Sequence, residues 1–241
     1  MGGTEFRLPV LAGVFGYAAR RAVALNLAIS LVTVASALLI RASTLSLTPV
    51  LGLLPVALAM MAGAVSAAFV GAALVHRISE RLLERFILVL LVGIGVALVG
   101  EAFLPQEVSS FLPGGSSPLV RLVVAAVFGL FIGLVSSLLG VAGGELIIPT
   151  LVFVFGAGIK TAGTASLLIS LPTVAVGVLR YRRLGSFADR ADVTQTVAPM
   201  GVGSVVGAVA GGLLVGLVPA AVLKFVLGVI LIISAVRIFY R

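Results

Sequence analysis

The chain has 241 residues, of which 61% are hydrophobic and only 10% are charged, with a net charge of +8. A soluble domain of this length would need a far more polar surface. The absence of cysteine excludes disulfides, thiol catalysis and cysteine-based metal sites. Basic residues at the ends of membrane helices mark orientation, so the positive charge does not indicate nucleic acid as a partner.

The charged residues are clustered and leave long apolar stretches between them, such as those from Arg41 to Arg77 and from Asp192 to Lys224. About 20 apolar residues cross a bilayer core as a helix. The stretches lack the polar alternation of a membrane barrel. We therefore predict an all-α membrane protein with about seven transmembrane helices plus short broken helices. The predicted spans are 21–40, 49–74, 84–103, 119–139, 160–180, 193–216 and 220–239, with short segments at 8–18 and in the glycine-rich stretch 140–158.

The first predicted segments recur 140 positions later in the chain, where 9–35 aligns with 149–175 without gaps. A weaker match continues from Pro55 to Pro199 and from 63–65 to 207–209. Internal duplication is typical of secondary transporter folds. We expect a first repeat at 1–104 that lacks its opening helix, a linker at 105–118 and a second repeat at 119–241. The thirteen identical pairs are Pro9/Pro149, Leu11/Leu151, Val14/Val154, Phe15/Phe155, Gly16/Gly156, Ala22/Ala162, Leu27/Leu167, Ile29/Ile169, Ser30/Ser170, Leu31/Leu171, Thr33/Thr173, Val34/Val174 and Ala35/Ala175.

The distribution of basic residues predicts how the two repeats face. If 140–158 crosses the membrane, eleven basic residues share one side and four lie on the other; if it dips in and returns, the split is seven to eight. The positive-inside rule favours the crossing arrangement, which makes the repeats inverted and places the C-terminus in the cytoplasm. The majority side holds Arg20, Arg21, Arg77, Arg81, Arg85, Arg180, Arg182, Arg183, Arg190, Arg237 and Arg241; the other holds Arg41, Arg121, Lys160 and Lys224.

The stretch 140–158 combines glycines, an acid and a proline within an apolar region. Gly140, Gly143 and Gly144 allow left-handed or extended backbone. A helix that begins near Glu145 would have Pro149 within its first turn or so, where a missing N–H matters least. Such an N-terminus presents N–H groups and the positive end of the helix dipole, which predicts an anion site at membrane depth. The alternative is that the glycines only allow close helix packing.

Two roles are open for Glu145. A buried acid in a membrane is costly and often functional, so this residue could carry a coupling proton. Alternatively, its carboxylate stabilises the N-terminus of the new helix and has no part in transport.

Polar residues flank the glycine-rich stretch and recur in both repeats. Positions 166, 170 and 173 share one helical face, and so do positions 26, 30 and 33. Two such stripes could line one path between the halves, or the side chains could simply bond helix backbones. The predicted substrate-binding residues are Gly140, Gly143, Gly144, Glu145, Ser136, Ser137, Ser166, Ser170, Thr173, Asn26, Ser30 and Thr33.

Three stretches resemble the TauE/SafE family of membrane permeases, also called sulfite exporters. They are "GLFIGLVSSLLGVAGGELIIPTLVFVFG", "TASLLISLPT" and "RYRRLGSFADRADV". The resemblance implies a duplicated architecture and transport of sulfite, sulfonates or related small organosulfur anions. In the first repeat, only Pro9 and the "FG" at 15–16 remain of the glycine-rich segment, and Asn26 replaces Ser166.

We therefore expect a secondary transporter that exports a small sulfur-containing anion across the cytoplasmic membrane by alternating access. An anion channel or a membrane subunit of a larger complex is the alternative. The sequence has no HExxH, GxSxG or Walker motif, so neither an enzyme nor an ATP-driven pump is expected, and no cofactor or metal. The expected partners are an organic or inorganic sulfur anion and the lipid bilayer, while a coupling proton and a homodimer are left open.

Overall fold

The computed structural model describes residues 7, 11, 15–17, 19–44, 48–74, 92–93, 96, 99–100, 111–112, 116–139, 142–183, 187 and 193–219, with 221–222, 225–226, 228–229 and 232–233. All regular structure within these residues is helical. The helices are α2 (Ala19–Thr44), α3 (Thr48–Leu51), α4 (Leu54–Leu74), α6 (Pro118–Leu139), α7 (Gly144–Phe153), α8 (Ile159–Arg183) and α10 (Ala198–Leu217), the last preceded by a π-helical turn at Val193–Val197.

Several predicted segments correspond to single helices, namely α2, α6 and α8. The segment predicted as one span at 49–74 is instead divided, because the chain turns at residues 52–53 between α3 and α4. The N–H of Leu53 donates to the carbonyl of Val50 in this turn, at 3.0 Å. Most of the segments predicted at 84–103 and 220–239 lie outside the described residues.

Three helices of the described part are long and apolar enough to cross a membrane: Arg21–Ser43, Pro118–Ser137 and Ile159–Arg183. Leu54–Phe69 and Gly144–Phe153 are shorter apolar helices. An all-helical membrane protein is therefore confirmed, whereas the count of about seven spans stays a prediction.

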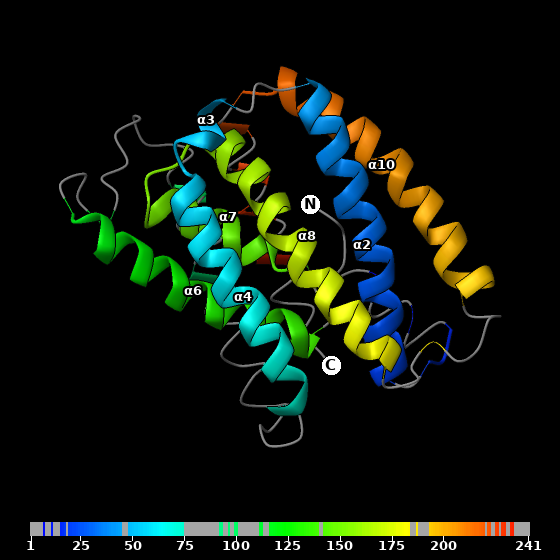
Figure 1. Ribbon diagram of the computed structural model, residues 1–241. Coiled ribbons are helices and arrows are strands. Elements are labelled where there is room, and N and C mark those ends of the chain that lie inside the picture. Colours follow the sequence, from blue (N-terminus) through cyan, green and yellow to red (C-terminus); the bar gives the residue numbers. More distant parts are fainter. Residues whose placement is uncertain are drawn as a thin grey trace.

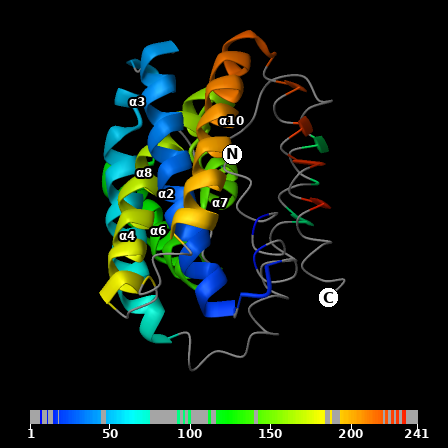
Figure 2. The same ribbon diagram turned by 90° about the vertical axis from the view of Figure 1, so that its right-hand side faces the viewer.

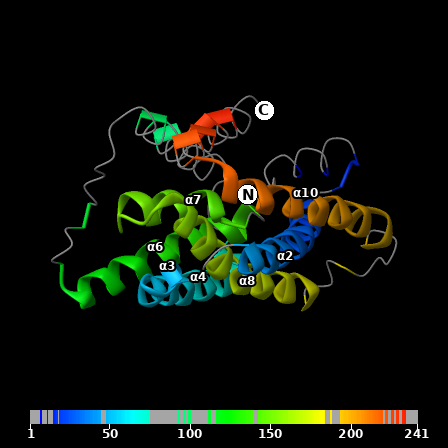
Figure 3. The ribbon, with the colours of Figure 1, turned by 90° about the horizontal axis from the view of Figure 1, so that it is seen from above.

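The long helices pack in a row in the order α6, α4, α8, α2 and α10, and α7 packs against α8 and α6 (Figure 1). Their axes lie side by side and roughly upright in Figure 2, and the view from above places α6 and α10 toward opposite ends of the row (Figure 3). The largest apolar core is formed by α4, α6, α7 and α8, with Met60, Ile147 and Leu151 among its most buried side chains. Within the row, the α8–α2 pair lies between α4 and α10.

Helices α2 and α8 run in opposite directions. Arg41, near the end of α2, donates to the carbonyl of Lys160 at the start of α8, at 3.3 Å. A Cβ on Gly177, toward the end of α8, would meet Leu27 in the first half of α2, at 3.5 Å.

Helices α4 and α6 run in the same direction and approach closely through glycines. A Cβ added at Gly129 would collide with the backbone of Met60, and one added at Gly133 with the backbone of Ala64. Toward the C-terminal ends of both helices, the Arg180 guanidinium of α8 lies 5.0 Å from the centre of the Phe69 ring of α4. Helix α8 therefore runs parallel to α4.

The helices of the two proposed repeats correspond in position. Helices α2 and α8 begin at residues 19 and 159, 140 positions apart, and α4 and α10 begin at 54 and 198, 144 positions apart. Apart from α6, the row is symmetric about the α8–α2 pair, since α4 lies beside α8 as α10 lies beside α2. Helix α6 has no counterpart among the described residues.

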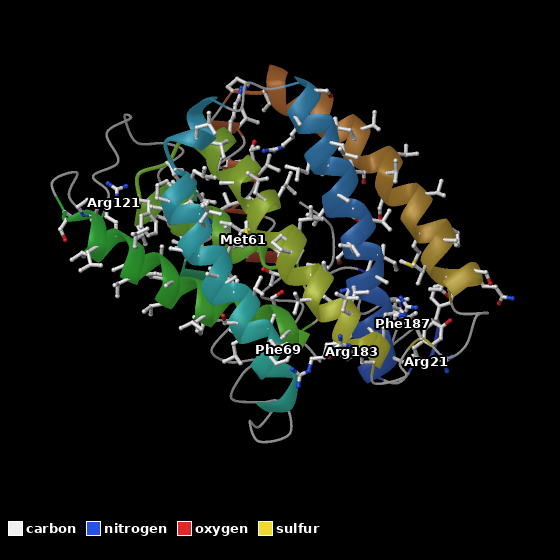
Figure 4. The ribbon with its side chains drawn as sticks, in the orientation of Figure 1. Arg21, Met61, Phe69, Arg121, Arg183 and Phe187 are labelled. Carbon is white, nitrogen blue, oxygen red and sulfur yellow. The ribbon has the colours of Figure 1, made fainter. Side chains whose placement is uncertain are left out.

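Three of the described arginines mark the two ends of the bundle. Arg21 and Arg183 lie near one end, and Arg121 lies near the other (Figure 4). Helix α7 leads back to the Arg121 end, because the N–H groups of residues 111 and 112 donate to the carbonyls of Phe153 and Val154, at 2.9 and 3.2 Å. The chain between α6 and α8 thus returns to the end at which α6 began.

Candidate functional site

Helix α7 begins inside the bundle at two glycines. Gly143 is left-handed, with φ 73° and ψ −2°, and its carbonyl accepts the N–H groups of Leu146 and Ile147, each at 3.0 Å. A Cβ on Gly143 would lie 3.1 Å from the Ile132 side chain. Because both the backbone angle and the space disfavour a side chain, only glycine fits this helix start without strain.

Helix α7 buries its acid and its proline. All residues from Glu145 to Val152 are buried, and Glu145 is only 8% exposed. Pro149 was expected within the first turn or so, but it is the sixth residue of the helix. Since proline has no N–H, it cannot form the helical hydrogen bond to the Glu145 carbonyl one turn earlier. The helix is thus weakened directly behind its N-terminus.

Two predicted serines lie beside this N-terminus. A Cβ on Gly143 would lie 3.7 Å from that of Ser136 on α6, and one on Gly144 would lie 3.9 Å from the Ser166 hydroxyl of α8. Helices α6, α7 and α8 therefore meet around Gly143 and Gly144. Gly140, also predicted to bind substrate, lies outside the described residues.

The stripes on α2 and α8 are buried on the two central helices. Their exposed fractions range from 0% at Asn26 and Ser30 to 8% at Thr33, with Ser166, Ser170 and Thr173 in between. Several of the hydroxyls donate within their own helices: Ser30 to the carbonyl of Asn26 at 2.7 Å, Thr33 to Ile29 at 2.8 Å, Thr173 to Ile169 at 2.8 Å, Ser166 to Gly163 at 2.8 Å, and Ser137 on α6 to Leu134 at 2.8 Å.

These backbone bonds are the alternative that the sequence left open. A hydroxyl whose proton is bonded to a carbonyl presents only lone pairs to its surroundings. Such a group can accept a hydrogen bond from a cation, but must rotate before it can donate to an anion. The hydroxyls of Ser30, Thr33, Ser166 and Thr173 therefore offer acceptors rather than donors in this structure.

Arg7 supplies a cation that the sequence analysis did not place at the site. Its Nη1 donates to the Thr33 hydroxyl at 3.5 Å. Its positive charge also interacts with the Glu145 carboxylate. The structure thus joins a basic residue of the first repeat to a threonine of α2, within electrostatic range of the acid of α7.

A signal for this arrangement is present in the sequence. If the 140-residue offset is extended upstream, Gly3 aligns with Gly143 and Glu5 with Glu145, and Arg7 falls at the position of Ile147. In sequence, more of the glycine-rich segment therefore remains in the first repeat than Pro9 and the "FG" pair.

A second polar contact, between α2 and α8, lies near the C-terminal end of α2. Arg41 Nη1 donates to the Thr164 hydroxyl at 3.1 Å as well as to the carbonyl of Lys160. A Cβ on Gly163 would lie 2.7 Å from the Arg41 guanidinium. Arg41 therefore lies across the surface of α8 where a glycine leaves room for it.

The family model described as sulfite exporter TauE/SafE matches residues 1–98 and 125–241. A curated relative, a probable membrane transporter protein of Methanocaldococcus jannaschii, is 28% identical over 123 residues, which cover 49% of this chain and 45% of the relative. The aligned part of the chain thus spans about half the length of that relative. No solved structure matches the chain. Since the family model covers most of its length, the chain belongs to the TauE/SafE family of membrane transporters and is not an enzyme.

Proposed function

We propose that this protein is a secondary transporter that moves a small sulfur-containing anion, such as sulfite or a sulfonate, across the cytoplasmic membrane by alternating access. The observation that carries the proposal is the buried start of α7, with Gly143, Gly144, Ser166 and Arg7 around it. A helix N-terminus favours an anion, and an adjacent guanidinium adds to this preference.

The arrangement of the helices supports inverted repeats at 1–104 and 119–241. Helices α2 and α8 correspond in sequence and run side by side in opposite directions. In transporters with such repeats, one half rocks against the other around a site at their interface. The site proposed here has this position, because Thr33 lies on α2 and Ser166 on α8.

The ends of the helices support an orientation. Arg21 and Arg183 lie at one end of the bundle and Arg121 at the other, as expected if the chain at 140–158 crosses the membrane. The positive-inside rule then places the Arg21 end, and the C-terminus, in the cytoplasm. Export runs from that end toward Arg121.

Transport in proteoliposomes tests this function. We expect saturable uptake of labelled sulfite or methanesulfonate that depends on an imposed gradient. Added unlabelled substrate should exchange for the labelled anion inside the vesicles. Gly143→Val should abolish it, because valine cannot adopt the left-handed angle and would meet Ile132. Gly203→Val is the matched control, since that glycine lies on exposed α10 with nothing within 4 Å.

The same preparation distinguishes the alternatives. Steady conductance in planar bilayers, without saturation or exchange, would identify an anion channel. A purified chain that transports none of the anions and conducts none would contradict both functions, and would favour a membrane subunit of a larger complex.

A further inference from the structure

Arg7 is a cation in the helix bundle whose role the family assignment leaves open. It is half-buried and extends from the start of the chain to Thr33 in the middle of α2. An ionised side chain at membrane depth is costly, and such residues usually face a partner or a substrate path. The location of Arg7 therefore indicates a role beyond packing.

The partners of Arg7 come from different parts of the fold. Thr33 belongs to α2, and its hydroxyl donates to the Ile29 carbonyl, so that a lone pair faces the Arg7 guanidinium. Glu145 belongs to the first turn of α7. The residue before it, Gly144, lies against Ser166 of α8. Ala142, just before α7, packs in one apolar cluster with Val34 of α2 and Val174 of α8. Thr33 precedes Val34, so the contact of Arg7 with Thr33 lies beside the junction of α2, α7 and α8.

We propose that Arg7 binds the anionic group of the substrate, and that Glu145 occupies Arg7 while the site is empty. The anion and the Glu145 carboxylate then exchange for one guanidinium. This inference rests on the proposed transport of an anion at the start of α7. It also accounts for an acid at a place where an anion binds, because Arg7 offsets the charge of whichever group is present.

The chemistry of the guanidinium defines the class of ligand. Its planar fork donates two parallel hydrogen bonds to a pair of oxygens on one atom, which an ammonium cannot match. Sulfite, sulfonates and carboxylates offer such a pair, whereas a halide does not. The site is therefore selective for oxyanions over halides, with the N-terminus of α7 available to a further oxygen.

The exchange makes opposite predictions for the two residues. Without Arg7, the Glu145 carboxylate stays beside the site and repels an anion. Without the charge of Glu145, Arg7 is available and the anion binds more tightly. Removing both charges restores part of the binding lost with Arg7 alone. A purely structural ion pair would instead make both single changes harmful.

Calorimetric titration of the detergent-purified full chain with sulfite, methanesulfonate and chloride tests the inference. We expect Arg7→Gln to weaken sulfite binding by about ten- to a hundredfold, the range for losing charge-assisted hydrogen bonds. Glu145→Gln should tighten it, and the double variant should fall between Arg7→Gln and the wild type. Arg7→Lys, which keeps the charge, should lose most of the preference for sulfite over chloride.

Arg183→Gln is the matched control, because it removes one exposed arginine at the end of α8 and should leave binding unchanged. Thermal unfolding verifies that each variant is folded, and Arg7→Lys carries the test if Arg7→Gln does not fold. Wild-type affinity in Arg7→Gln, or undiminished selectivity in Arg7→Lys, overturns the role of Arg7 and leaves the transport function standing. A wild-type chain that binds none of the oxyanions overturns both.

Discussion

Gly16 and Gly156, which are 140 positions apart, adopt the same left-handed backbone angle, with φ 69° at each. The hydrogen bonds around them also correspond. The N–H of Tyr17 donates to the Leu11 carbonyl at 3.1 Å, and the N–H of Ala157 donates to that of Leu151 at 3.0 Å. Leu11 and Leu151 are both fully buried. The segment before Gly16 therefore ends with the same turn as α7.

Replacing either glycine by alanine should destabilise the protein to a similar extent. A left-handed angle costs a side-chain-bearing residue about 1–2 kcal/mol. We expect Gly16→Ala and Gly156→Ala to lower the thermal midpoint of the detergent-solubilised protein by comparable amounts. Gly203→Ala, on the open face of α10, should not lower it. A clear loss at only one of the two positions would mean that the two turns contribute unequally to stability.

The close contact between α4 and α6 offers a second matched pair. A Cβ on Gly63 would collide with the Ala126 carbonyl, whereas its counterpart on α10, Gly207, has nothing within 4 Å. We expect Gly63→Ala to cost about 1–3 kcal/mol, as overpacking of an interior does. Gly207→Ala should be neutral or slightly stabilising, because alanine favours a helix. Unfolding in graded detergent mixtures measures both, and equal losses would contradict the assigned packing.

The sequence was sufficient for the class of fold, because charge-free apolar runs of bilayer length are typical of membrane helices and rare in soluble domains. The 140-residue offset of the repeat also predicted where α8 begins relative to α2. The turn at Gly52 was missed, since one glycine and one leucine do not interrupt an apolar run. Whether 49–74 continues or turns depends on contacts with other helices, which hydropathy does not contain.

The site was predicted only in part. Gly143, Gly144, Glu145, Ser136 and Ser166 come together because a helix start, its flanking loop and the next helix are near in sequence. Arg7 was missed, since 138 positions separate it from Glu145. Only the extended repeat, in which Glu5 aligns with Glu145, would have drawn attention to the start of the chain.

The contact of Arg41 with α8 leads to a prediction about gating. Its hydrogen bonds to Thr164 and to the Lys160 carbonyl hold α2 and α8 together at the end that we assign to the outside. We expect Arg41→Gln to favour the outward-open form. The chain has no cysteine, so a single Ser166→Cys can report access to the site.

In membrane vesicles, an impermeant maleimide applied from outside should label Ser166→Cys several times faster when Arg41→Gln is also present. Labelling from the cytoplasmic side should slow correspondingly, because one form is populated at the expense of the other. Arg121→Gln is the control at the same end, since its guanidinium lies over the Phe155 ring and does not join α2 to α8. Equal rates with and without Arg41 would show that this contact does not close the path.

Substitution of Glu145 also separates the two roles that the sequence left open for it, coupling proton or stabilised helix start. If a proton on Glu145 accompanies the anion, Glu145→Gln should remove the acceleration that a pH gradient gives, yet keep exchange of labelled for unlabelled anion. A glutamine is neutral at every pH in the working range, so the proton has no acceptor there.

If the carboxylate only stabilises the start of α7, the response to the gradient should persist. The thermal midpoint should then fall, since a charge near a helix N-terminus contributes about 0.3–1 kcal/mol. Proteoliposome flux with and without a pH gradient, measured beside thermal unfolding of the same preparation, decides between these outcomes.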